Sequence, residues 1–300
     1  MTPLFTLFAL VAFAANSILC RLALGQGAID AATFTSIRLT SGALALLLLT
    51  AVTSRPASKD SRAGSWTSAL LLFLYAMPFS FAYVSLGVAN GALILFLSVQ
   101  ATMLLGAIRT GERIHWLEWL GIVVAIGGLV VLVAPGLSAP NPAGAALMAV
   151  AGVAWGIYSL RGRSSTDPIG DTAANFLRAV PFALAASAGS AAAFGSAHFS
   201  TGGLLLAVGS GVLASGVGYV AWFAALRHLK ALQAAALQLT VPVIAAAGGI
   251  LLLSERISMR LVLSALLILG GVGLAVGGRA VRARAGSQAA PPSRSRPLSP

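Results

Sequence analysis

Ten apolar stretches of about 20 residues follow one another along the chain, and this feature limits the possible folds most strongly. They lie near residues 4–23, 33–52, 66–86, 90–108, 116–134, 143–160, 171–193, 202–226, 231–253 and 258–277. A helix of roughly 20 residues crosses the bilayer core, which is about 30 Å thick. Backbone groups that face lipid must be paired, and the strands of a membrane barrel would be only about ten residues long. The sequence therefore predicts an all-α integral membrane protein with about ten transmembrane helices.

The connections between the apolar stretches are short and carry most of the charged residues. Only 9% of the 300 residues are charged and 58% are hydrophobic, whereas about a quarter of the residues in a soluble domain are charged. None of the connections is long enough to form a separate domain. After the last stretch, residues 278–300 are rich in Arg, Ser and Pro, which predicts a disordered basic cytoplasmic tail.

Lysine and arginine residues are distributed unevenly between alternate connections. If the N-terminus is cytoplasmic, fourteen of the nineteen fall in inside loops or in the tail. The positive-inside rule then places both termini in the cytoplasm. The formal net charge of +12 is explained by this topology, so we expect no nucleic-acid partner. We expect a multi-pass protein of the inner (plasma) membrane, whose surroundings are the lipid bilayer.

The second half of the chain repeats features of the first half. Residues that match at a shift of 140 or 143 are identical in the two copies: Arg21 and Arg161, Arg38 and Arg178, Glu112 and Glu255. We therefore divide the chain into two five-helix repeats, residues 1–139 and 140–277. Because five is odd, the second repeat enters the membrane from the opposite side, so the repeats are inverted. In carriers built this way, the substrate site lies near the bilayer midplane between the repeats.

The sequence around these matched residues is similar to a known family. The second stretch of each half carries an early Arg, in FTSIRLTSGALALLL and ANFLRAVPFALAAS, and a Glu follows the fourth stretch, in GERIHWLEWLGIVVAIGGLVVLVAP and SERISMRLVLSALLILGGVGLAVGG. Together with the ten-helix plan, this pattern resembles the EamA family of the drug/metabolite transporter superfamily over residues 4–277. The resemblance implies an inner-membrane carrier whose central cavity is lined mainly by the first, third and fourth helices of each half. It also implies transport, commonly outward, of amino acids or other small metabolites.

Aromatic and amide side chains inside the apolar stretches are the candidates for lining a substrate cavity, because polar groups in lipid are costly and face a cavity or another helix. Two aromatic pairs with a spacing of three residues each lie on one helix face: Trp155 with Tyr158, and Tyr219 with Trp222. The cavity candidates are Asn16, Tyr75, Tyr83, Gln100, Trp155, Tyr158, Tyr219, Trp222 and Gln238. The alternative is that these side chains serve ordinary packing between helices.

Four charged residues near the ends of the stretches have both a structural and a functional interpretation. Arg38 and Arg178 lie about 8 to 11 Å inside a span end, so each can reach an interface or a helix-end carbonyl, or can bind a substrate carboxylate. Glu112 and Glu255 precede the fifth and tenth stretches, where a carboxylate caps the helix N-terminus or acts in gating. No Asp or Glu lies in the middle of a stretch. The sequence therefore shows no buried proton-carrying carboxylate.

An intramembrane enzyme and a non-transporting receptor or scaffold are the alternatives from other functional classes. An enzyme needs an activated nucleophile, paired acids or metal ligands. The three histidines lie at loops, the single Cys20 has no partner, and Ser210 in the segment VGSGVLASG lacks an embedded histidine. We therefore expect no catalysis, metal or cofactor, and the glycines around Ser210 predict a loosened helix instead. The substrate, the coupling ion and the oligomeric state are left open.

Overall fold

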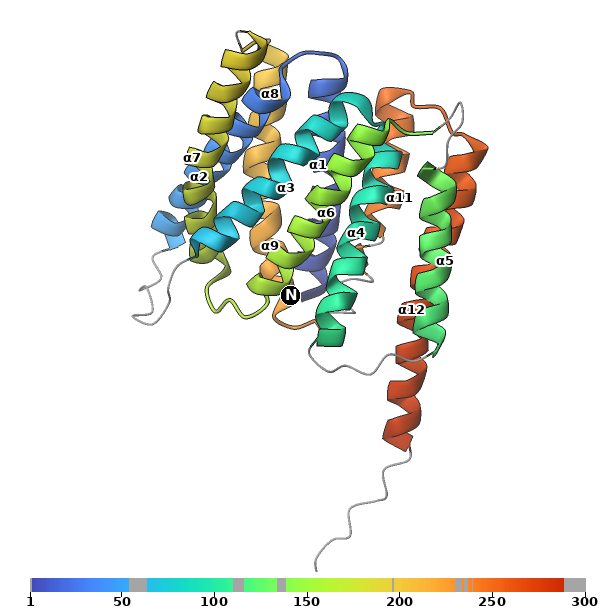
Figure 1. Cartoon of the computed structure of the whole chain (residues 1–300). Coiled ribbons are helices and arrows are strands. Elements are labelled where there is room, and N and C mark those ends of the chain that lie inside the picture. The colour runs from blue at the N-terminus through green and yellow to red at the C-terminus, as the bar shows by residue number, and fades with distance from the viewer. Residues whose placement is uncertain are drawn as a thin grey trace, which may run out of the picture.

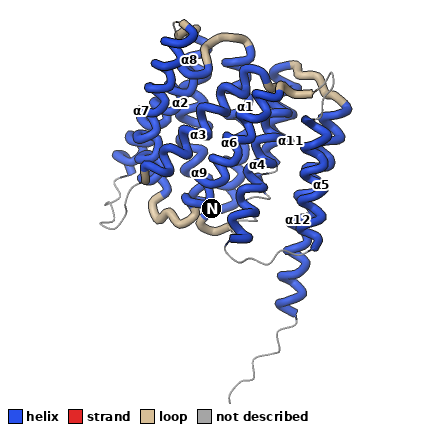
Figure 2. The backbone as a smooth tube through the Cα atoms, viewed as in Figure 1, coloured by secondary structure: helices blue, strands red, loops and turns tan. Residues whose placement is uncertain are grey.

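The computed structural model describes residues 2–53, 64–109, 116–133, 139–195, 197–229, 234, 237–238 and 240–288. These residues form a bundle of helices (Figures 1 and 2). The helices are α1 (Thr2–Gly25), α2 (Ala31–Thr53), α3 (Trp66–Ser85), α4 (Val88–Arg109), α5 (Trp116–Val133), α6 (Pro142–Gly162), α7 (Pro168–Phe194), α8 (Thr201–Gly209), η1 (Ser210–Val217), α9 (Gly218–Leu226), α11 (Thr240–Leu253) and α12 (Met259–Gln288).

Each of the ten predicted spans contains helix, so the predicted all-α membrane fold is confirmed. Seven helices in the described part of the chain are long and apolar enough to cross a bilayer. The remaining three spans contain shorter apolar helices, at Trp119–Gly128, Thr240–Leu253 and Met259–Gly271. Many large apolar side chains are exposed on the outside of the bundle, as expected for a surface that faces lipid.

Capping side chains determine where several helices begin. The residue before the helix accepts a hydrogen bond from a backbone amide three residues later at Ser65, Asn141, Asp167 and Ser200. In α6 and α7 a proline follows the cap, at a position where its missing N–H has no helical partner to lose. These local signals allow the connections to stay short.

The main contacts between helices keep the same pattern when the two halves are exchanged. α6 packs against α3 and α4, and α1 packs against η1, α9 and α11. The second helices of the halves, α2 and α7, pair with each other, as do the fifth and tenth, α5 and α12, which stand at one edge of the bundle (Figure 1). α1 begins at one end of the bundle and α6 begins at the opposite end. The prediction of two inverted five-helix repeats is therefore confirmed.

Loops from the two halves are joined at one end of the bundle by a short antiparallel bridge. Asp30 N–H donates to the His198 carbonyl (3.1 Å) and Ser200 N–H donates to the Ala28 carbonyl (2.7 Å). The Asp30 carboxylate accepts from the amides of Thr33 (2.8 Å) and His198 (3.2 Å). Burial acts to raise the pKa of Asp30, but these hydrogen bonds outweigh it and hold the pKa below the usual 3.8. We call this end of the bundle the bridge end.

The opposite end is joined by side-chain contacts instead of a backbone bridge. Gly64 N–H donates to Asp171 Oδ1 (2.9 Å) and Ser65 N–H donates to Asn175 Oδ1 (2.9 Å). The second Asp171 oxygen accepts from the Ser165 hydroxyl. We call this end the cavity end, because a polar cavity opens beside these residues.

The eighth span is interrupted by η1, a π-helical segment between α8 and α9. Gly211 of η1 lies so close to α2 that a Cβ atom there would meet the carbonyl oxygen of Arg38. π-helical turns are frequent at functional sites, where they change the direction of side chains. The sequence predicted a loosened helix here, and the structure shows that it takes the π form.

The C-terminal segment differs from the prediction. Disorder was predicted from residue 278, but α12 continues to Gln288. Arg and Ala, which have high helix propensity, dominate the first part of this segment, and its first proline is Pro291. Residues 289–300 lie outside the described part of the chain.

Candidate functional site

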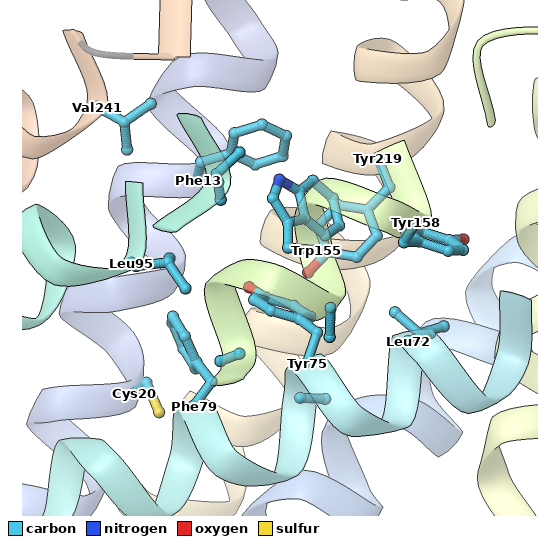
Figure 3. Close-up of a cluster of buried hydrophobic side chains, with 14 of the residues drawn as sticks. Phe13, Cys20, Leu72, Tyr75, Phe79, Leu95, Trp155, Tyr158, Tyr219 and Val241 are labelled. Carbon is cyan, nitrogen blue, oxygen red and sulfur yellow. The ribbon is translucent and has the colours of Figure 1, made fainter. Parts of the chain in front are cut away.

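Aromatic side chains from the two halves meet at the centre of the bundle (Figure 3). The rings of Trp155 on α6 and Tyr219 on α9 have centroids 4.6 Å apart, and the Tyr75 ring on α3 lies 5.0 Å from Trp155. Phe13 on α1 packs edge-on against Trp155 at 5.3 Å and against Tyr219 at 5.9 Å. Ring pairs in these geometries contribute stability beyond the area that they bury. We call these four residues the aromatic centre.

Two further predicted residues flank the aromatic centre. Trp222 packs edge-on against Phe13, with centroids 5.5 Å apart. Tyr158 lies 5.7 Å from Trp155, and its hydroxyl accepts from Asn175 Nδ2 at 3.4 Å. The members of each aromatic pair therefore lie on one helix face, as their spacing predicted, and both pairs contact the aromatic centre.

A series of polar groups runs beside the aromatic centre and crosses between the halves. Ser210 Oγ donates to Asn16 Oδ1 (2.6 Å), and Asn16 Nδ2 donates to the Tyr75 hydroxyl (3.1 Å). On the other side, Trp155 Nε1 donates to Gln238 Oε1 (3.1 Å). Because buried polar groups need partners of this kind, the amides of Asn16 and Gln238 are held in defined orientations.

Arg38 joins this series from α2. Its side chain is 0% exposed. Its Nε donates to Ser215 Oγ (2.9 Å), and its Nη2 donates to the hydroxyls of Tyr219 (2.8 Å) and Tyr75 (3.2 Å). The guanidinium also lies 5.2 Å from the centroid of the Phe79 ring, within cation–π range. The expectation that Arg38 reaches an interface or a helix-end carbonyl is therefore wrong, because hydroxyl groups and rings surround it inside the bundle.

Two of the predicted cavity residues have a different setting. Tyr83 lies two turns along α3 from Tyr75 and packs edge-on against Phe79 at 4.8 Å. A Cβ atom at Gly91 of α4 would collide with the Tyr83 ring, so this tyrosine fills the contact between α3 and α4. Gln100 is buried on α4, and its part in a substrate site stays a prediction.

Arg178, the sequence counterpart of Arg38, lies toward the end of the bundle. It is half-buried on α7, and a Cβ atom at Gly64 would be 2.8 Å from its Nη1. Gly64 belongs to the cavity end. The matching arginines of the two repeats therefore occupy different environments. Arg38 lies at the centre, whereas Arg178 lies near a span end, which is where the sequence analysis allowed both residues to lie.

Glu255 caps a helix, but not the one that follows it in sequence. Its Oε1 and Oε2 accept from the Val88 amide at the start of α4, at 2.8 and 3.0 Å, and Oε1 lies 3.9 Å from Nε of Arg21. The predicted cap of the tenth helix is wrong because α12 begins only at Met259, where the Ser258 hydroxyl accepts from a helix amide instead. Glu112 lies outside the described residues.

One hollow lies at the aromatic centre, and a second reaches the flanking residue Tyr158. The first is a gap of about 10 Å³, lined by Phe13, Tyr75, Phe79, Leu95, Phe96 and Trp155. The second is a cavity of about 390 Å³ at the cavity end, whose polar lining includes Ser68, Arg161, Asp171 and Asn175, and which reaches the Tyr158 side chain. The central cavity expected at the midplane is therefore closed in this structure by packed rings, and the 390 Å³ cavity reaches its flank at Tyr158 from one end.

Three residues of the centre were not among the predicted site residues. Phe13 contacts three of the predicted rings, and its spacing of three residues from Asn16 was the signal that placed it on the same helix face. Ser210 and Ser215 reach the centre because η1 turns them toward α1 and α2. Only the glycines around them marked this segment in the sequence.

The side chains at the centre are of the kinds that bind small molecules. Its side chains offer flat apolar faces, neutral hydroxyl and amide groups, and one cation. The Ser210 hydroxyl donates to an amide oxygen, which is not a general base. Among the described residues, no group of three or more His, Cys, Asp or Glu residues is arranged to hold a metal ion. The arrangement suits a small molecule with an aromatic or aliphatic part and a polar group.

Comparison with protein families gives a match that covers both repeats. The model of the EamA-like transporter family matches residues 1–134 and 142–277. A solved crystal structure superposes with a TM-score of 0.64, covering 89% of this chain and 97% of the other, at 20% sequence identity. At this identity, the likeness concerns the fold alone.

Curated relatives cover much of the chain. An uncharacterized protein of Pseudomonas aeruginosa is 47% identical over 94% of this chain and 96% of its own length. An uncharacterized transporter of Archaeoglobus fulgidus is 31% identical over 65% of this chain and 69% of its own length. A probable amino-acid metabolite efflux pump of Escherichia coli is 30% identical over 67% of this chain and 75% of its own length.

Proposed function

Because the chain belongs to the EamA-like transporter family, we propose that it is a secondary carrier that exports a small metabolite, an amino acid or a related compound, across the inner membrane. The convergence of rings from α1, α3, α6 and α9 at the centre of an inverted repeat is the observation that carries the proposal. The name of the Escherichia coli relative supports this substrate class and an outward direction.

The route that we propose begins at the cavity end. The loops at this end carry the basic residues that the positive-inside rule assigns to the cytoplasm. A metabolite in the 390 Å³ cavity contacts Tyr158, whose ring lies beside Trp155 of the aromatic centre. An exporter must bind its substrate from the cytoplasmic side, so entry through this cavity suits export.

The function is tested by transport of labelled amino acids into inside-out vesicles or proteoliposomes. Replacement of Trp155 or Trp222 by Leu should lower the apparent affinity several-fold, because a ring contact contributes about 1 kcal/mol. Trp119→Leu is the control, since Trp119 is exposed on α5 at the edge of the bundle. Wild-type transport by both central variants would return these residues to a packing role.

Two rival functions give different results in the same preparation. A receptor or scaffold would bind a metabolite without moving it, and an enzyme would release a product in detergent solution. Absence of flux for every compound, with binding retained, would refute the carrier proposal.

The orientation is tested by labelling introduced cysteines with an impermeant thiol reagent in intact cells. Ala197 is exposed near the bridge end and Thr166 is exposed near the cavity end. We expect Ala197→Cys to react from outside and Thr166→Cys to react only after the membrane is permeabilised. The reverse pattern would place the cavity end outside and would contradict export by this route.

A further inference from the structure

Two central side chains in the described part of the chain have a buried nitrogen without a hydrogen-bond partner, and of these Trp222 is neutral whereas Arg38 is charged. A guanidinium carries five N–H donors. Nε and Nη2 use theirs on Ser215, Tyr219 and Tyr75. Nη1 is buried and has no hydrogen-bond partner. Two donors of a charged group therefore point into the interior without an acceptor.

The charge of Arg38 is also unpaired within the described part of the chain. All its hydrogen-bond partners are hydroxyl groups. Four acidic side chains have partners at the bundle ends: Asp30 at the bridge end, Asp167 at the cap of α7, Asp171 at the cavity end and Glu255 at the start of α4. A buried cation without a counter-ion is costly, and ionisable groups within a membrane usually mark a functional site.

The surroundings of the guanidinium connect it to the proposed substrate site. Tyr75 accepts a hydrogen bond from Arg38, and its ring lies 5.0 Å from Trp155. Tyr75 and Phe79 lie against the guanidinium and also line the 10 Å³ gap of the centre. A ligand that widens this gap would have its apolar part against the rings and its polar end near Arg38.

We infer that Arg38 binds the anionic group of the substrate, and that the carrier selects small metabolites that bear a carboxylate. A carboxylate supplies the negative charge and the acceptor oxygens that Nη1 lacks, in the geometry that a guanidinium matches well. This inference rests on the proposed function, and it assigns the substrate class of the same site. Arg178 takes no part, because it lies near the cavity end.

The test compares each acid with its amide, in which a neutral group of similar size replaces the carboxylate that Arg38 would bind. Leucine and phenylalanine are paired with leucinamide and phenylalaninamide at pH 7, where the carboxylates are ionised. Binding to the purified protein in detergent is followed by tryptophan fluorescence. We expect the wild-type protein to bind the acids about tenfold or more tightly than the amides. Equal affinity for acid and amide, or binding of neither acid, would overturn the inference.

Variants at the two matched arginines show whether the preference comes from Arg38. In Arg38→Gln the preference for the acid should fall to within about twofold, and in Arg38→Lys part of it should remain, because the charge is kept without the fork of donors. Arg178→Gln is the matched control and should keep the wild-type preference. A wild-type preference in Arg38→Gln would overturn the inference. If Arg38→Gln does not fold, the wild-type comparison decides alone.

Transport separates this inference from the proposed function. Wild-type proteoliposomes that bind the acids selectively but move none of them would refute the carrier proposal and leave the carboxylate site supported. Proteoliposomes that move acids and amides at the same rate, with equal affinity, would support the carrier and overturn the role of Arg38.

Discussion

The two repeats share a fold but differ at its centre. The second helix of the first repeat presents Arg38 to the centre, whereas the second helix of the other repeat keeps Arg178 near the cavity end. The third helix of the first repeat, α3, is α-helical throughout in spite of Pro78. The corresponding span of the second repeat is interrupted by the π-helical segment η1. The copies therefore preserve the pairing of helices and differ where a ligand would be bound.

The difference has a local physical cause. η1 supplies Ser215 as an acceptor for Arg38, and its Gly211 allows the backbones of η1 and α2 to approach closely. A guanidinium in an apolar interior needs acceptors of this kind. The π segment and the central arginine therefore depend on each other, and substitutions that remove either the close approach or the acceptor test this dependence.

The largest effect is expected from closing the space at Gly211. In Gly211→Ala, the new Cβ atom would overlap the backbone of Arg38, which cannot move aside as a side chain can. We expect a loss of about 3 kcal/mol of stability, seen as a fall of about 6 °C or more in the thermal unfolding midpoint in detergent.

Gly209→Ala is the matched control for this substitution. No atom lies within 4 Å of a Cβ atom at Gly209, and Ala favours helix over Gly. Its unfolding midpoint should equal or exceed that of the wild type. Equal stability of the two variants would show that α2 and η1 do not need this close approach.

The next effect is expected from removing the acceptor of Arg38. Ser215→Ala leaves the Nε donor of a buried cation unpaired in addition to the two donors of Nη1, which should cost about 2 kcal/mol. Ser80→Ala on α3 is the comparison in the first repeat, because Ser80 accepts only from the neutral hydroxyl of Thr35. Chemical denaturation of both variants should show the larger loss at Ser215, and similar losses would mean that the charge of Arg38 adds nothing.

A smaller effect is expected where the first repeat relies on the second for a helix cap. Glu255→Ala removes the acceptor of the Val88 amide and should cost about 1 kcal/mol. Asn141→Ala removes a cap of α6 within its own chain segment and should cost about the same. A double-mutant cycle of Glu255 with Arg21 isolates their 3.9 Å contact, which lies partly in solvent and should contribute less than the cap.

The smallest effect concerns pH at the bridge end. The hydrogen bonds that hold the pKa of Asp30 below 3.8 stabilise the fold fully above that pH, and this contribution is lost as the pH falls through the lower value in the folded state. Asp30→Asn should therefore flatten the dependence of the unfolding midpoint on pH below about 4. An unchanged pH profile would show that the bridge holds without the carboxylate.

The repeated apolar stretches of this sequence were sufficient to predict the architecture. Ten apolar stretches and the odd number of helices in each repeat predicted the inverted bundle, and spacings of three residues placed the central aromatic pairs on common faces. The settings of Arg38 and Glu255 could not be predicted, because they depend on helices far away in sequence. Tyr75 and Ser215 come to Arg38 from α3 and η1, and Val88 comes to Glu255 from the opposite repeat.

The unequal closure of the two ends has a kinetic consequence. The bridge end is held by two backbone hydrogen bonds together with the Asp30 contacts, whereas the cavity end already contains open space. In a carrier that alternates between sides, release of the bridge would then be the slower movement. Turnover at saturating substrate would then depend on the rate at which the hydrogen bonds of the bridge break. A weaker bridge would raise turnover and leave the affinity for substrate at the cavity end unchanged.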